Sequence, residues 1–215
     1  MMGFTIRSGA GLVLALGLLA MMTAEAARPP GLDLPQDPQA TGSTAGRLLV
    51  ATADLDDPNF YHTIVYMVRH DQTGAMGLVI NRRLGRGPIG KLLESLGLEA
   101  EGNGAAEIDV HYGGPVQRDQ GFILHSPDFK GEDTVVLSKS VALTSSLDVL
   151  SAIAAGHGPQ HSLFALGYAG WSPNQLEREL AAGAWVVVDP DEALLFDEQI
   201  DSKWQRALDR QGVDL

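Results

Sequence analysis

The stretch Gly74–Asn81 constrains the fold more than any other part of the chain. It reads Gly-Ala-Met-Gly-Leu-Val-Ile-Asn, an apolar core between two turn signals. The run Thr63–Val68 comes just before it, so the two stretches predict a β-hairpin with a short, glycine-bearing loop. Gly74 and Gly77 flank Met76 where a strand normally carries bulk, which predicts that another backbone or a ligand approaches closely there.

Composition limits the size of the core and the classes of partner. The chain has 215 residues, 45% of them hydrophobic, enough for one ordinary globular domain. Its formal charge is −12 and its bases are scattered, so we expect no nucleic-acid partner. The absence of cysteine excludes disulfides, thiolate metal ligands and cysteine nucleophiles. The histidines show no ligand spacing, so we predict neither a metal site nor a cofactor.

The first 26 residues have the three parts of a secretory signal peptide. Arg7 is the one charge of the n-region, an apolar run covers residues 9–22, and Ala-Glu-Ala at 24–26 supplies a cleavage site. The apolar run is about 14 residues long, shorter than the roughly 20 that cross a bilayer. We therefore predict a cleaved peptide, a periplasmic protein and no membrane anchor. The alternatives are a mis-assigned start codon or an apolar helix of the domain, with a protein that stays in the cytoplasm.

Residues 27–45 are predicted to form a disordered spacer before a single domain at 46–215. The spacer is rich in proline and small polar residues and has hardly any large apolar side chain. Beyond it, strands and helices mix without an internal repeat. Because the two long strands form a hairpin, the sequence predicts an α/β domain with a mixed sheet and helices on its faces, not a purely parallel sheet.

The remaining elements follow from apolar runs and turn signals. The predicted strands cover residues 47–52, 108–112, 121–125, 134–137, 162–168 and 184–188, and the predicted helices cover residues 88–96, 145–155, 173–182 and 200–211. Ser145 and Ser172 begin capping-box patterns for two of the helices. In the last helix, Ile200, Trp204 and Leu208 are spaced to form a buried stripe.

The segment that follows the hairpin contains a glycine pattern. Gly85-x-Gly87-x-x-Gly90 matches the dinucleotide-binding fingerprint, but residues 81–84 separate the preceding strand from the first glycine. The fingerprint requires a tight turn directly at the strand end. We therefore predict a mobile connection here and no nucleotide site.

Several separate motifs resemble those of the AlgH/YqgE family. They are Leu-Leu-Val-Ala at 48–51, Asp-Pro-Asn-Phe at 57–60, the stretch 74–82, Gly-Gly-Pro-Val at 113–116, Leu-Gly-Tyr-Ala-Gly-Trp at 166–171 and Gln-Leu-Glu at 175–177. The resemblance implies one α/β domain with a mixed sheet and no established activity. Many members carry the label of transcriptional regulator, and members are usually cytoplasmic. The export signal departs from that pattern and places the regulator label in doubt.

Candidates for a ligand or partner site are polar, small or aromatic residues of these motifs. They are Asp57, Asn59, Asn81, Arg82, Gly113, Gly114, Trp171 and Glu177. At a strand end, Asn81 and Arg82 could bind a carboxylate or phosphate. The alternative is that Asn81 satisfies a turn and Arg82 pairs with an acid. The glycines could expose backbone N–H groups beside them or form a structural turn.

The other candidates also have two interpretations. Trp171 could be an exposed recognition residue or part of the core. Glu177 could pair with a base or lie free on the surface. Asp57, His125 and Ser126 could form a nucleophilic triad, but no Gly-x-Ser-x-Gly motif is present, so we predict no catalytic residue and expect Asp57 to cap a turn.

The leading hypothesis is therefore a non-enzymatic binding or regulatory domain, exported to the periplasm, that acts through a protein partner or a small ligand. One alternative is a cytosolic transcriptional regulator, as the family label suggests. The other is a hydrolase-type enzyme.

Overall fold

The computed structural model describes residues 42–99, 102–131 and 133–210. The predicted signal peptide and residues 27–41 of the predicted spacer lie outside these ranges. The spacer prediction is wrong at its end, because residues 43–45 pack on the domain. Thr44 is buried, its backbone N–H donates to His70 Nδ1 at 3.1 Å, and Ser43 Oγ donates to the His70 carbonyl at 2.9 Å.

The described residues contain a ten-stranded sheet. Its strands are β1 (Leu48–Ala51), β2 (Ile64–Asp71), β3 (Gly74–Val79), β4 (Arg83–Pro88), β5 (Glu107–Tyr112), β6 (Val116–His125), β7 (Val135–Val136), β8 (Ala142–Thr144), β9 (Ser162–Trp171) and β10 (Trp185–Val188). The main order is β10-β1-β2-β3-β9-β6-β8-β7, with β5 pairing β4 and β9. Because β5 and β9 are parallel and the other pairs antiparallel, the sheet is mixed, as predicted.

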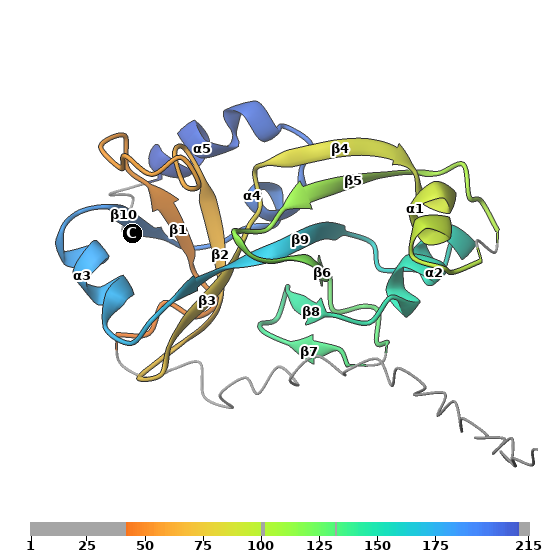
Figure 1. The fold of residues 1–215 in the computed structure, drawn as a ribbon, viewed down its shortest axis with the longest axis horizontal. Helices are drawn as coiled ribbons and strands as arrows, with labels where there is room; N and C mark the ends of the chain where they lie inside the picture. The colour runs from red at the N-terminus through yellow and green to blue at the C-terminus, as the bar shows by residue number, and fades with distance from the viewer. Residues whose placement is uncertain (1–41, 100–101, 132, 211–215) are drawn as a thin grey trace, which may run out of the picture. The chain divides into compact units, whose positions relative to one another are not determined.

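Five helices lie in the described part of the chain: α1 (Ile89–Ser95), α2 (Asp148–Ala155), α3 (Gln175–Ala181), α4 (Glu192–Phe196) and α5 (Ile200–Leu208). In Figure 1, α1 and α2 lie together at one end of the sheet and α3 at the other. One buried cluster packs Leu176 of α3 against Leu49, Val65 and Trp185. A second packs α1 and α2 against β6 and β9. The α/β prediction, with helices on the sheet, is therefore confirmed.

The hairpin at the start of the domain is confirmed. β2 and β3 pair antiparallel from Asp71 opposite Gly74 to Val65 opposite Val79. The close approach predicted at the glycines is also present, and it is made by protein. A Cβ at Gly74 would overlap the Trp171 carbonyl oxygen of β9, and one at Gly77 would overlap β2. The small residues therefore let neighbouring strands pack, which agrees with their role in sheets.

The predicted mobile connection after this hairpin is wrong, because residues 83–88 form strand β4. β4 pairs antiparallel with β5 and has no second strand partner in the part of the chain that the structure describes. Two features limit pairing of the outer edge of β4 with another strand. A bulge falls between Arg83 and Gly85, and Pro88, which lacks an N–H, closes the strand.

Other differences concern helix starts and the C-terminal region. The predicted capping box at Ser145 does not begin α2, which starts at Asp148 after Leu147. At α3 half of the box forms, since Ser172 N–H donates to Gln175 Oε1 at 3.1 Å. The fully buried residues of α5 are Lys203 and Ala207 and not the predicted stripe. Strand β8 and helix α4, of 3 and 5 residues, are too short for an apolar pattern to predict them.

Candidate functional site

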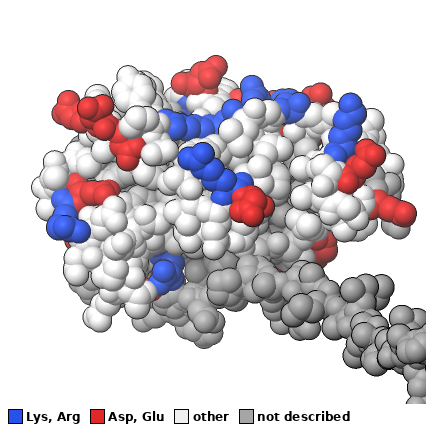
Figure 2. Space-filling view, in the orientation of Figure 1, with Lys and Arg blue, Asp and Glu red and all other residues white. Residues whose placement is uncertain are grey.

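A cavity of about 850 Å³ opens where β3, β4 and β5 approach the α4–α5 segment. Its lining comprises Asn59, Asn81, Arg82, Arg83, Leu84, Tyr112, Arg118 and residues 198–202. Three of the predicted site residues, Asn59, Asn81 and Arg82, therefore meet in one place. Figure 2 shows Lys and Arg side chains, with acidic side chains among them, over the surface where β4 and α5 lie in Figure 1.

Arg82 holds the loop before β2 in place. Its Nη1 donates to the carbonyls of Pro58 at 3.1 Å and Asn59 at 3.0 Å, and its Nη2 donates to that of Tyr61 at 2.8 Å. Carbonyls are neutral, so the guanidinium keeps its full positive charge. The side chain thus orders one wall of the cavity and also contributes charge to it.

Asn81 bridges two backbone groups across the β2–β3 hairpin. Its Oδ1 accepts the N–H of Ile64 at 2.8 Å, and its Nδ2 donates to the carbonyl of His62 at 2.8 Å. An amide side chain has the same donor and acceptor pair as a peptide group, so it continues the ladder past the end of β3. Both groups are therefore engaged by the backbone, as the structural interpretation expected.

Two guanidinium groups lie near the ring of Tyr112. The Cζ atoms of Arg82 and Arg118 are 6.0 and 5.9 Å from the centre of its ring. Its hydroxyl donates to Asn59 Oδ1 at 3.3 Å, and Asp57 orients that amide by accepting the Asn59 N–H at 2.8 Å and Nδ2 at 3.1 Å. Asp57 therefore caps the turn, as predicted. Rings attract cations over their faces, so Tyr112 draws both guanidiniums to this side of the cavity.

Arg118 differs from the other arginines of the cavity. It is exposed, and its guanidinium forms no hydrogen bond or ion pair to any residue within 42–99, 102–131 or 133–210. Arg83 pairs with Asp109 at 3.3 Å, and Arg82 is bound to carbonyls. The hydrogen-bond donors of Arg118 are therefore free for a ligand.

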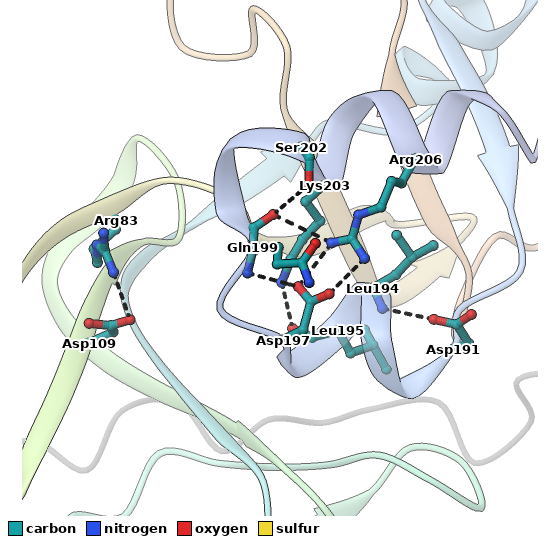
Figure 3. A network of polar contacts seen from close by, with 10 residues as sticks. All are labelled: Arg83, Asp109, Asp191, Leu194, Leu195, Asp197, Gln199, Ser202, Lys203 and Arg206. Atoms are coloured by element: carbon teal, nitrogen blue, oxygen red, sulfur yellow. Dashed lines mark hydrogen bonds and ion pairs between the residues drawn. The ribbon is translucent and has the colours of Figure 1, made fainter.

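The α4–α5 segment forms the opposite wall, and a partly buried ionic network fixes it (Figure 3). Asp197 accepts Arg206 at 2.7 Å and lies 3.6 Å from Lys203 Nζ, which also donates to the Leu195 carbonyl at 3.3 Å. Lys203 is 1% exposed, and burial lowers its pKa although Asp197 opposes the shift. Burial acts to raise the pKa of Asp197, but the hydrogen bond from Arg206 and the charge of Lys203 outweigh it and lower that pKa.

The remaining predicted residues do not line this cavity. Gly113 and Gly114 are buried where β9 passes, and a Cβ on either would overlap the backbone of Gly167 or Tyr168. The N–H of Gly113 donates to the Leu166 carbonyl at 2.8 Å. Both glycines therefore allow strands to cross closely, and the N–H of Gly113 is engaged by β9.

Of the two interpretations of Trp171, the structure agrees with the core residue and not with the exposed recognition residue, since its side chain is 6% exposed. Trp171 and Trp185 both donate their indole N–H to Glu179 Oε2 at 2.8 Å, and Phe60 packs against both rings. Glu177 pairs with a base, His70 Nε2, at 3.1 Å on a different part of the surface.

The residues of the hypothetical triad are occupied separately. His125 is fully buried and its Nδ1 contacts the Ser126 carbonyl at 2.9 Å, Ser126 Oγ donates to the His161 carbonyl at 3.3 Å, and Asp57 binds Asn59. Among the described residues, no side-chain hydrogen bond joins Asp57, His125 and Ser126 to one another. No group of three or more His, Asp or Glu side chains in that part of the chain is arranged to hold a metal ion. None of its helices is long and apolar enough to span a membrane.

Sequence reasoning missed Tyr112 and Arg118. Tyr112 ends an ordinary strand, and Arg118 belongs to the polar run Gln-Arg-Asp-Gln at 117–120. Neither pattern marks a site, because the two residues become neighbours of Arg82 only when β5 and β6 both pair with β9.

Comparison with known proteins gives consistent matches. A family model described as AlgH-like matches residues 48–215. A UPF0301 protein of Methylococcus capsulatus is 44% identical over 181 residues, which cover 84% of this chain and 98% of the relative. A UPF0301 protein of Caulobacter vibrioides is 45% identical over 170 residues, which cover 78% and 87%.

Solved structures match as well. The solution structure of the AlgH protein from Pseudomonas aeruginosa superposes with a TM-score of 0.68 at 40% identity, covering 84% of this chain and 94% of that one. A crystal structure of a protein from Corynebacterium diphtheriae, 15% identical, has a TM-score of 0.61 over 79% of this chain and 87% of its own, and shares the fold.

Proposed function

The chain belongs to the AlgH-like family, and on that premise we propose that it is a binding protein whose cavity beside Tyr112 holds an anionic group, a carboxylate or a phosphate. The observation that carries the proposal is the free guanidinium of Arg118 in a preformed cavity, next to the aromatic ring of Tyr112. The chain carries a net charge of −12, so a position where cationic groups gather is unusual for it.

The chemistry of the cavity favours an anion. A guanidinium presents paired N–H donors that match the two oxygens of a carboxylate or phosphate. Arg82 adds a second positive charge, and the ring of Tyr112 holds it near Arg118. A volume of about 850 Å³ lies within the range of small-molecule sites, which supports a small ligand or a short segment of a partner.

The binding test uses the full chain, with inorganic phosphate and acetate as probes in an NMR titration. We expect shifts at Tyr112 and Arg118 in the wild type and at least about tenfold weaker binding by Arg118→Gln, since one charged hydrogen-bonded contact is worth this much. Arg178→Gln is the matched control, because Arg178 of α3 is exposed and donates only to the Asn174 carbonyl among the described residues. No shift with either probe at tens of millimolar, or equal affinity in the Arg118 variant, would refute the proposal.

We also propose that the protein acts in the periplasm. Support comes from the charged start, apolar run and Ala-Glu-Ala site of residues 1–26. N-terminal sequencing of the protein from fractionated cells tests this proposal. A periplasmic protein that starts at Ala27 is the expected result. A cytosolic protein with an intact Met1 would refute export and favour the regulator named by the family label.

A further inference from the structure

The same cavity carries an unpaired negative charge, and we infer, resting on the function proposed above, that its ligand is zwitterionic: an amino acid or a short peptide with a free ammonium and a free carboxylate. The carboxylate would lie at Arg118, and the ammonium at Asp201. Both side chains line the cavity.

Asp201 is the acidic counterpart of Arg118. It is exposed, and across the described ranges of the chain it forms no ion pair or hydrogen bond through its carboxylate. Glu198, the other acid of the lining, pairs with Arg86 at 3.3 Å. Asp201 and Arg118 therefore face one cavity without neutralising each other. A simple anion would satisfy Arg118 but be repelled by Asp201, whereas a ligand with both charges satisfies both groups.

The backbone holds these two charges apart. Asp201 lies in the first turn of α5, and α5 is fixed to the sheet because Trp204 Nε1 donates to the Ala51 carbonyl at 2.8 Å. The ion pair between Asp197 and Arg206 fixes the same helix from the side of α4. Arg118 belongs to β6 and rests against Tyr112. The two charges thus come from separate, anchored elements, and a ligand must span them.

The lining between the charges includes apolar surface. Leu84 is 60% exposed at the bulge of β4, and Ile200 lines the cavity from α5. An exposed leucine in a cavity wall favours a ligand with an apolar side chain. A dipeptide such as Ala-Leu combines all three features: an ammonium, a carboxylate and an apolar side chain.

Asp201 also has a simpler interpretation. An acidic residue in the first turn of a helix stabilises that helix through the macrodipole without any ligand. The two interpretations differ in what Asp201→Asn changes. If Asp201 only stabilises the helix, Asp201→Asn lowers the melting temperature and leaves ligand selectivity unchanged. If Asp201 binds the ligand, the same substitution removes the preference for a ligand with a free ammonium.

The test compares three forms of one dipeptide in titrations of the full chain: free Ala-Leu, N-acetyl-Ala-Leu and Ala-Leu amide. The wild type should bind the free form about tenfold more tightly than either blocked form, the effect of one charged contact. Asp201→Asn should lose the preference for the free amine and keep the preference for the free carboxylate. Arg118→Gln should do the reverse. Asp209→Asn, at the opposite end of α5, is the matched control and should keep both preferences.

Each contrary result separates this inference from the function proposed above. If N-acetyl-Ala-Leu binds the wild type as tightly as the free dipeptide, or if Asp201→Asn changes only the melting temperature, the zwitterion inference fails and anion binding stands. Binding of phosphate or acetate without binding of any dipeptide has the same meaning. If none of these probes binds, both proposals fail.

Discussion

Replacing Asn81 by alanine should lower the free energy of unfolding of the domain even when no ligand is present. The change removes both bonds of the side chain, so the N–H of the buried Ile64 and the carbonyl of His62 lose their partners. His62 also has a φ of 54°, a left-handed value that a non-glycine residue holds only when its surroundings fix it. Two bonds at about 1 kcal/mol each, plus part of the penalty for an unsatisfied buried N–H, predict a loss of about 2–4 kcal/mol.

Asn81→Asp tests the two bonds separately. The carboxylate can still accept the N–H of Ile64, but it cannot donate to the His62 carbonyl and instead faces it with a second oxygen. We expect a loss smaller than that of the alanine variant, about 1–3 kcal/mol, because one bond is retained.

Urea and thermal unfolding of the full chain measure both variants. For a domain of this size, each 1 kcal/mol shifts the melting temperature by about 2–4 °C, so Asn81→Ala should melt roughly 4–16 °C lower. Asn103→Ala is the control, since the exposed Asn103 keeps its backbone bond to Ala154. An alanine variant within about 0.5 kcal/mol of the wild type, as is usual for surface changes, would refute the structural role of Asn81. If that variant also failed to bind anions, Asn81 would instead be a ligand residue.

Four further predictions concern other parts of the structure. Burial lowers the pKa of Lys203 below its ordinary 10.5, so the folded chain binds that proton less readily than the unfolded chain. Stability should therefore rise with pH between the pKa of the folded chain and that of the unfolded chain. Urea unfolding at a series of pH values should show this rise in the wild type and not in Lys203→Met. Asp197→Asn leaves the buried ammonium of Lys203 without its counter-charge and should lower the free energy of unfolding by about 3 kcal/mol at neutral pH. Lys203→Met is the comparison, and its stability should be close to that of the wild type. Gly114→Ala should lower stability by more than about 3 kcal/mol or prevent folding, because the new Cβ would overlap the backbone of Tyr168. The control Gly85→Ala has open space around it and should stay within about 1 kcal/mol of the wild type. Equal stabilities of the two variants would contradict the close crossing of β9. Glu179→Gln should lower stability by about 1–2 kcal/mol and shift tryptophan fluorescence, because the carboxylate accepts both indole N–H groups, and an unchanged spectrum would contradict this shared bond.

Local pattern determined much of the fold. The two apolar runs and the loop at 72–73 define the β2–β3 hairpin, because each strand's pairing partner is its neighbour in sequence. The capped turn at Asp57 is local for the same reason. By contrast, residues 83–88 have no strand pattern, and they become β4 because β5, more than 18 residues away, supplies the partner.

Some residues of the candidate site can likewise be recognised from local sequence, and others cannot. The sequence by itself singled out Asn81 and Arg82 at a strand end, together with the family motifs around them, since adjacent residues and a run of apolar side chains are enough to mark such a position. It also establishes that the chain is acidic and free of cysteine.

Only the tertiary structure decided which groups share the cavity. Arg118 lies between Val116 and Gly121, where β6 loses its register with β9, so an irregular backbone turns it toward Tyr112 and Arg82. Asp201 arrives from α5 at the far end of the chain, through the anchoring of that helix to β1. Such meetings depend on long-range packing, and no short window of sequence contains the contacts that produce them. The sequence around strand Gly74–Val79 identifies one wall of the cavity, and the tertiary fold adds the charges of Arg118 and Asp201 to it.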